Sequence, residues 1–141
     1  MSFTIAFTLF RSQTKEFSSE NLLFWQEVRQ WRSSALAVVS GGGAAREQTS
    51  TVLATLFAIH RKYILRGAPY EVNLPHDLRE LASAPVSALE TLAADAGASQ
   101  LDVEAVNMQV KDFPSVLDAA AAEVLALMEK DSFRRYKKQL A

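Results

Sequence analysis

The stretch EFSSENLLFW, residues 16–25, has the pattern of a helix end, a tight turn and the capped start of a second helix. Ser18 is a favoured N-cap residue, and Asn21 stands three positions later, where a capping box places Glu or Gln. Apolar residues then recur at helical spacing: Phe24, Val28, Trp31 and Ala35. The stretch therefore predicts a polar contact surface, rich in acidic side chains, on a rigid helical base.

The composition indicates an all-α protein. The 141 residues are most simply one domain, residues 1–141, and a chain of this size typically buries about 68–70% of its unfolded surface. Hydrophobic residues make up 49% and charged residues 22%, which is ordinary for a globular protein and argues against disorder. Only five Gly and four Pro occur, while Ala and Leu are abundant, so helices are the leading prediction.

The net charge and the cysteine count exclude several classes of protein. A net charge of −1 gives no basic excess for binding nucleic acid or an anionic membrane. Because the chain has no cysteine, disulfides and thiolate metal sites are excluded, and a reducing compartment fits. The apolar N-terminus lacks a basic region, and Arg11 and Lys15 interrupt it, so neither a signal peptide nor a membrane span is expected.

The first half of the chain predicts three long helices. Their expected ranges are 3–16, 19–37 and 45–66. Three glycines at 41–43 predict a flexible connector rather than a phosphate-binding loop, because no Gly-Lys-Ser/Thr follows them. Gly67 and Pro69 predict the end of the third helix.

The second half is punctuated by Pro85, Gly97 and Pro114. Short helices are expected at 76–83, 86–95 and 100–110. Pro114 predicts the start of a helix whose inward stripe is Leu117, Ala120, Ala121, Val124 and Met128. Asp131 and Ser132 interrupt that stripe and predict a final short helix at 133–140.

No constellation of residues predicts an active site of the chain's own. The two histidines, His60 and His76, lie in no metal-ligand motif, and His60 falls on the apolar side of a helix, which favours a packed core histidine. No cysteine nucleophile and no G-x-S-x-G motif occurs. Glu16 and Glu20 are four residues apart, but a turn separates them, so solvated acids are the simpler interpretation. We expect no cofactor and no metal.

Asn73 lies in the short extended turn YEVNLP, residues 70–75. Spacing alone favours a buried-turn asparagine that bonds its own backbone over a contact residue.

Three separated segments nevertheless resemble one family, the regulator of G-protein signalling (RGS) domain. Residues 16–25 are similar to its E-[FY]-S-x-E-N-x-x-F-W signature. YEVNL, residues 70–74, resembles its E-[IV]-N-[LI] loop, and LMEKDSFRRY, residues 127–136, resembles its L-M-x-x-D-S-[YF]-x-R-F ending. The resemblance covers about residues 6–140.

The resemblance implies an all-α fold of roughly nine helices, with a four-helix bundle and a smaller subdomain made by the two chain ends. It implies a GTPase-activating protein that binds activated Gα in the cytoplasm, at the inner face of the plasma membrane. Such a protein is no enzyme itself: Gα holds its catalytic arginine in cis and hydrolyses GTP at about 10⁻² s⁻¹ unaided. The gain comes from holding the mobile Gα switch regions in the arrangement that suits the transition state.

The resemblance also implies a Gα-contact surface. Its members are Glu16, Glu20, Asn21, Asn73, Leu127, Asp131, Ser132 and Arg135. Glu16, Glu20 and Asn21 match one wall, and Asn73 matches an amide that reaches the switch regions. Leu127, Asp131, Ser132 and Arg135 match the other wall. The resemblance implies that Asp131 accepts a hydrogen bond from a threonine of the Gα switch regions and that Arg135 supports Asp131. The residues that match the family core are Phe24, Trp25, Val124, Met128 and Phe133. The resemblance thus replaces the turn interpretation of Asn73 and the idle-acid interpretation of the glutamates.

Two departures from the family pattern carry expectations. Family members usually have short helices before the equivalent of residue 6, so the terminal subdomain is expected to be incomplete, with upstream sequence or a dimer contact covering Phe3, Phe7 and Phe10. The stretch between Leu74 and Leu117 is longer than in compact members and is expected to change Gα subtype preference. The alternative function is a binding-only scaffold that recruits another signalling partner. Such members often lose the contact amides and the Asp-Ser pair, which this chain keeps.

Overall fold

The structure is a computed structural model that describes residues 20–41, 46–96 and 101–140. Side chains are described for these residues except 46, 47 and 131–140. The helix expected at 3–16, the cap at Ser18 and the cover expected over Phe3, Phe7 and Phe10 lie outside the described residues.

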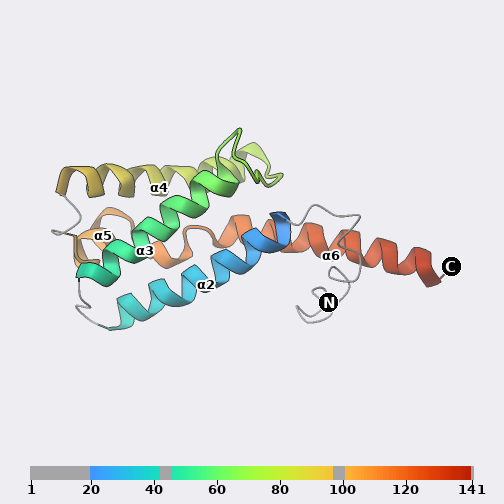
Figure 1. Cartoon of the computed structure of the whole chain (residues 1–141), viewed down its shortest axis with the longest axis horizontal. Coiled ribbons are helices and arrows are strands. Elements are labelled where there is room, and N and C mark those ends of the chain that lie inside the picture. Colours follow the sequence, from blue (N-terminus) through green and yellow to red (C-terminus); the bar gives the residue numbers. More distant parts are fainter. Residues whose placement is uncertain (1–19, 42–45, 97–100, 141) are drawn as a thin grey trace.

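Four long helices form a bundle (Figure 1). The elements in chain order are α2 (Glu20–Ser40), α3 (Arg46–Ile59), the π-helix η1 (His60–Ile64), α4 (His76–Ala96), α5 (Val103–Gln109), the 3₁₀-helix η3 (Phe113–Ser115) and α6 (Asp118–Leu140). Contacts close a ring in which α2 packs on α3, α3 on α4, α4 on α6 and α6 on α2. Within the described ranges the secondary structure is helical and contains no strand. The prediction of an all-α four-helix bundle is confirmed.

The buried face of α2 is the one that the sequence predicts. Its buried residues are Phe24, Trp25, Val28, Trp31, Ala35 and Val38, which recur at helical spacing. The indole nitrogen of Trp31 donates to the carbonyl oxygen of Val52 in α3 at 2.8 Å, and the Trp31 ring meets the Phe113 ring of η3 edge-on at 6.3 Å. One side chain of α2 therefore joins three elements.

The prediction of two short helices at 76–83 and 86–95 is wrong, because α4 runs unbroken through Pro85. Proline in a helix interior removes one backbone hydrogen bond and crowds the preceding turn, at a cost of about 3 kcal/mol or more. Ala82, Val86 and Leu89 are buried on one face of α4, and the burial of this face offsets the cost. Leu81, whose carbonyl loses its helical partner, lies on the exposed side of α4.

The break expected at Asp131 and Ser132 is also wrong, since α6 is one helix from Asp118 to Leu140. The sequence after Asp118 contains no Gly or Pro and is rich in strong helix formers, so two polar residues do not end it. The predicted inward stripe of α6 is buried. Pro114 lies in η3 rather than at the start of α6, after Asp112 in a left-handed conformation with φ of 56°.

The third helix changes to π geometry at His60 and ends at Ile64, two residues earlier than expected. Gly67 adopts φ of 82° in the following loop. The third short helix expected in the second half is present as α5, and Asp102 caps it by accepting a hydrogen bond from the Ala105 amide at 2.9 Å.

His60 is a packed histidine between η1 and α4, as its position on the apolar face predicts. It is 3% exposed, and its Nε2 lies 2.9 Å from the Ser83 hydroxyl oxygen. Its Nδ1 is 3.9 Å from a Glu90 carboxylate oxygen. Burial lowers the pKa of His60 below its usual value, and the charge of Arg61 acts in the same direction, while Glu90 opposes both. The folded protein therefore holds this imidazole neutral.

The lowered pKa of His60 predicts a pH-dependent contribution to stability. That contribution is fully present above pH 6.5, the ordinary value, and is lost as the pH falls through the lower folded-state pKa, because the unfolded chain takes up the proton first. Denaturant titrations between about pH 7.5 and about pH 5 should show a steeper loss of unfolding free energy for the wild type than for His60→Gln. Parallel pH profiles of the two proteins would contradict this prediction.

Met128 and Met108 provide a matched test of the packing of α6 in the bundle. Met128 is 5% exposed in α6, whereas Met108 is 89% exposed in α5. Met128→Ala should lower the free energy of unfolding by about 2–5 kcal/mol, since it removes buried methylenes and leaves a cavity. Met108→Ala should change it by no more than about 0.5 kcal/mol. Equal losses in urea denaturation would mean that this part of α6 does not pack as described.

Candidate protein-interaction site

The loop formed by residues 65–75 folds back onto the end of η1. The last carbonyls of a helix lack intrahelical partners, and the loop supplies donors for them. The Tyr70 amide donates to the Lys62 carbonyl at 3.1 Å, and the Val72 amide donates to the Tyr63 carbonyl at 2.9 Å. The sequence that follows η1 is therefore held against it by backbone hydrogen bonds.

Asn73 lies on the outer side of this loop. Val72 and Leu74 are 1% and 6% exposed and belong to the core, while Asn73 between them is exposed. Successive side chains of an extended segment point to opposite sides, so burying both neighbours directs Asn73 outward. The Asn73 side chain makes no hydrogen bond among the described residues. Its exposure excludes the buried-turn interpretation that spacing alone favours.

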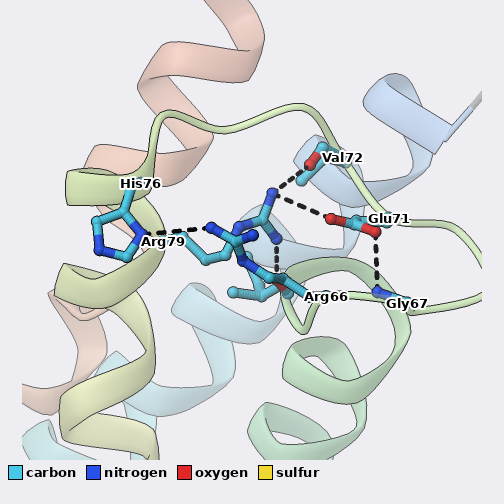
Figure 2. Close-up of polar contacts among 7 residues, drawn as sticks. Arg66, Gly67, Glu71, Val72, His76 and Arg79 are labelled. Atoms are coloured by element: carbon cyan, nitrogen blue, oxygen red, sulfur yellow. Dashed lines mark hydrogen bonds and ion pairs between the residues drawn. The ribbon is translucent and has the colours of Figure 1, made fainter.

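Arg79 of α4 joins the two sides of the loop (Figure 2). Its guanidinium donates to the carbonyl of Ile64 through Nη1 and to the carbonyl of Val72, at 3.2 Å, through Nη2. Nη2 also lies 3.3 Å from a Glu71 carboxylate oxygen, and the other Glu71 oxygen accepts from the Gly67 amide at 2.9 Å. Arg79 is 8% exposed, so this is a largely buried cation with a carboxylate partner.

A polar cluster ties η1, the element that precedes the loop, to α2. The hydroxyl of Tyr63 donates to the Glu27 carboxylate, which lies 3.4 Å from the Lys62 ammonium. Burial and this hydrogen bond raise the pKa of Tyr63 well above its usual value, so the phenol remains a donor. The Tyr63 ring packs on Phe24 at a centroid distance of 5.4 Å, and Lys62 lies 5.5 Å from the exposed Tyr70 ring.

Helices α2 and α6 run antiparallel to each other along the same bundle. Arg32 of α2 pairs with Asp118 of α6 at 3.2 Å, and Trp25 and Leu125 line one surface depression. Because the helices run antiparallel and Arg32 pairs with the first residue of α6, the turns of α2 before Arg32 run alongside later turns of α6. The start of α2 therefore lies beside the second half of α6.

The described part of the predicted site gathers at one end of the bundle. The start of α2, the loop 65–75 and the second half of α6 all lie at that end, while α5 lies at the other (Figure 1). Glu20 and Asn21 form the start of α2 and are partly buried, as is Leu127 of α6. Asn73 is exposed in the loop.

Other members of the predicted site can be placed only in part or not at all. The backbones of Asp131, Ser132 and Arg135 follow in α6, and their side chains are outside the described part of the structure. Glu16 lies outside the described residues. Of the predicted core, Phe24, Trp25, Val124 and Met128 are buried, and the side chain of Phe133 is not described.

The residues that shape the loop were not singled out from the sequence. Arg79 could have been found, because it opens the buried stripe of α4, followed by Ala82, Val86 and Leu89 at helical spacing. A cation at an inward position indicates a paired buried charge. The contact between Glu27 and Tyr63 joins residues that are 36 positions apart in the sequence, and no local sequence pattern predicts it.

The described residues contain no group of three or more His, Cys, Asp or Glu side chains that could hold a metal ion. None of the helices in the described ranges is long and apolar enough to cross a membrane. What the described part of the site presents is a polar, backbone-stiffened surface at the end of a helical bundle, which suits recognition of another protein.

Comparison with known proteins supports the same conclusion. A model of the Regulator of G protein signaling domain matches residues 3–140. The chain is 30% identical over 126 residues to "Regulator of G-protein signaling 16" of Bos taurus, covering 89% of this chain and 45% of the relative. It is 29% identical over 127 residues to the protein of the same name from Rattus norvegicus, covering 89% of this chain and 46% of that relative. The chain thus spans about half the length of these relatives, and it belongs to the regulator of G protein signaling domain family.

Proposed function

We propose that this chain is a GTPase-activating protein for heterotrimeric Gα subunits, which hydrolyse the GTP themselves. The observation that carries the proposal is Asn73, exposed between the buried Val72 and Leu74 at the same end of the bundle as the start of α2. An uncharged amide on a stiff loop can donate and accept hydrogen bonds at an interface without the desolvation cost of a charge. Membership of the family supports Gα as the partner.

The proposed mechanism is differential binding. A surface that fits the Gα switch regions best in their transition-state arrangement lowers the barrier without adding a catalytic group to the nucleotide. Rigidity is essential, because a flexible surface would adapt equally well to the ground state. The hydrogen bonds that tie the loop to η1, and the Tyr63–Glu27 contact that ties η1 to α2, supply that rigidity.

The proposed contact set keeps the residues given by the family motifs. It comprises Glu16, Glu20, Asn21, Asn73, Leu127, Asp131, Ser132 and Arg135. A transient complex of this kind would bury about 1,200–1,600 Å² in total. We further propose that residues 1–141 fold as one domain and that it acts in the cytoplasm, at the inner face of the plasma membrane where Gα resides.

Single-turnover GTP hydrolysis by purified Gα, with and without the protein, tests the proposal. Acceleration is expected with at least one Gα subtype, together with tighter binding to Gα carrying GDP and aluminium fluoride than to Gα carrying GDP. No acceleration across the Gα subtypes would refute it, and binding without acceleration would favour the scaffold function instead.

Asn73→Ala tests the role of the exposed amide. Losing hydrogen bonds buried at the interface should cost about 1–3 kcal/mol, which is about 5- to 150-fold in affinity for Gα carrying GDP and aluminium fluoride. Because Asn73 is exposed in the free protein, the substitution should change the unfolding free energy of the protein by no more than about 0.5 kcal/mol. The matched control is Asn107→Ala in α5, at the opposite end of the bundle, which should leave affinity unchanged. Unchanged affinity in Asn73→Ala with a large loss of stability would point to a structural role only.

A further inference from the structure

We propose that Arg79 is the positioning residue that sets the direction of Asn73, a role that rests on the proposed function of that amide. Arg79 lies in the first turns of α4, six residues beyond Asn73, and is 8% exposed. Its guanidinium reaches Ile64 before the loop and Val72 near the loop's end, so it bridges the loop from beneath (Figure 2). Arg79 thus holds the backbone at Val72, the residue immediately before Asn73.

The action on Asn73 follows from the peptide plane. The Val72 carbonyl that accepts from Arg79 Nη2 belongs to the peptide unit that joins Val72 to Asn73. Because that unit is planar, fixing its oxygen fixes the amide of Asn73 as well. The Val72 amide is held on the other side by the Tyr63 carbonyl at 2.9 Å. Both dihedrals of Val72 are thereby constrained, and with them the direction in which Asn73 leaves the core.

The geometry requires arginine rather than any cation. A guanidinium offers donors on two separate nitrogens in a fixed plane, so it can serve the carbonyls of Ile64 and Val72 together. A lysine ammonium is a single point on a flexible stem, and at most one carbonyl would keep the same geometry. Glu71 balances the charge at 3.3 Å and carries the connection on to the Gly67 amide. Arg79 thus contacts Ile64, Glu71 and Val72 directly, and Glu71 extends the connection to Gly67.

Arg79→Lys tests this role in the free protein, independently of any Gα activity. Backbone ¹⁵N order parameters of residues 71–74 should fall from about 0.85 towards about 0.6, while those of α2 and α5 stay unchanged. The amide of Val72 should also exchange its hydrogen faster. Unchanged order in the loop would overturn the proposal. Should Arg79→Lys fail to fold, Arg79→Met serves in the same measurement with the same expected fall in order, because it keeps an apolar stem and removes both donors to the carbonyls of Ile64 and Val72.

A double-mutant cycle with Gα separates positioning from general destabilisation. Arg79→Lys should lower the affinity for Gα carrying GDP and aluminium fluoride about tenfold when Asn73 is present, because its amide is no longer aligned. In the Asn73→Ala background the same substitution should have an effect of less than about twofold. Equal losses in both backgrounds would overturn the positioning role. The control is Val106→Ala, which removes buried volume in α5 away from the loop and should leave affinity unchanged.

The two proposals fail in distinguishable ways. If the wild-type protein neither binds nor activates Gα, the proposed function fails, and the order parameters of residues 71–74 still decide whether Arg79 holds the loop. If the wild type activates Gα and the cycle shows no coupling, the function stands and the positioning role falls.

Discussion

Three consecutive carbonyl oxygens at the end of η1 need hydrogen-bond donors, and meeting that need shapes the candidate site. Those of Lys62 and Tyr63 are met by the loop's own amides, and that of Ile64 by Arg79 of the next helix. A loop bound in this way has little freedom, because each donor fixes a different part of it. The outward direction of Asn73 thus follows from the hydrogen bonds that supply donors to the last carbonyl oxygens of η1.

The bundle extends this constraint to the neighbouring elements. Tyr63 packs its ring on Phe24 and donates its hydroxyl to Glu27, so the helix that ends in the loop is joined to the helix that opens the site. The antiparallel pairing of α2 with α6 brings the third segment to the same end. Segments about 50 residues apart in sequence thus form one surface. A surface assembled on buried contacts changes shape little on binding, as differential binding of a transition state requires.

Periodicity predicted the parts of the fold that depend on burial. The inward faces of α2 and α6 and the packed His60 follow from the spacing of apolar residues, and they are found as expected. Breaker residues misled at Pro85, where burial of a helix face outweighs a local preference, and at Asp131, where strong helix formers on both sides continue the helix. The Asn73 turn was misread from spacing because its exposure depends on Val72 and Leu74 entering a core built elsewhere in the chain. The place of Arg79 at the head of the buried stripe of α4 could have indicated a paired buried cation, but its carbonyl partners at Ile64 and Val72 leave no trace in the sequence.

The most direct test of the proposed Gα-binding surface is hydrogen exchange of the full chain with and without Gα carrying GDP and aluminium fluoride. Exchange should slow in residues 65–75, in the first turn of α2 and in the second half of α6, and stay unchanged in α5. With Gα carrying GDP alone, the slowing should be much smaller. Protection confined to α5 and the opposite end of the bundle, or equal protection by both nucleotide states, would contradict a surface built for the transition state.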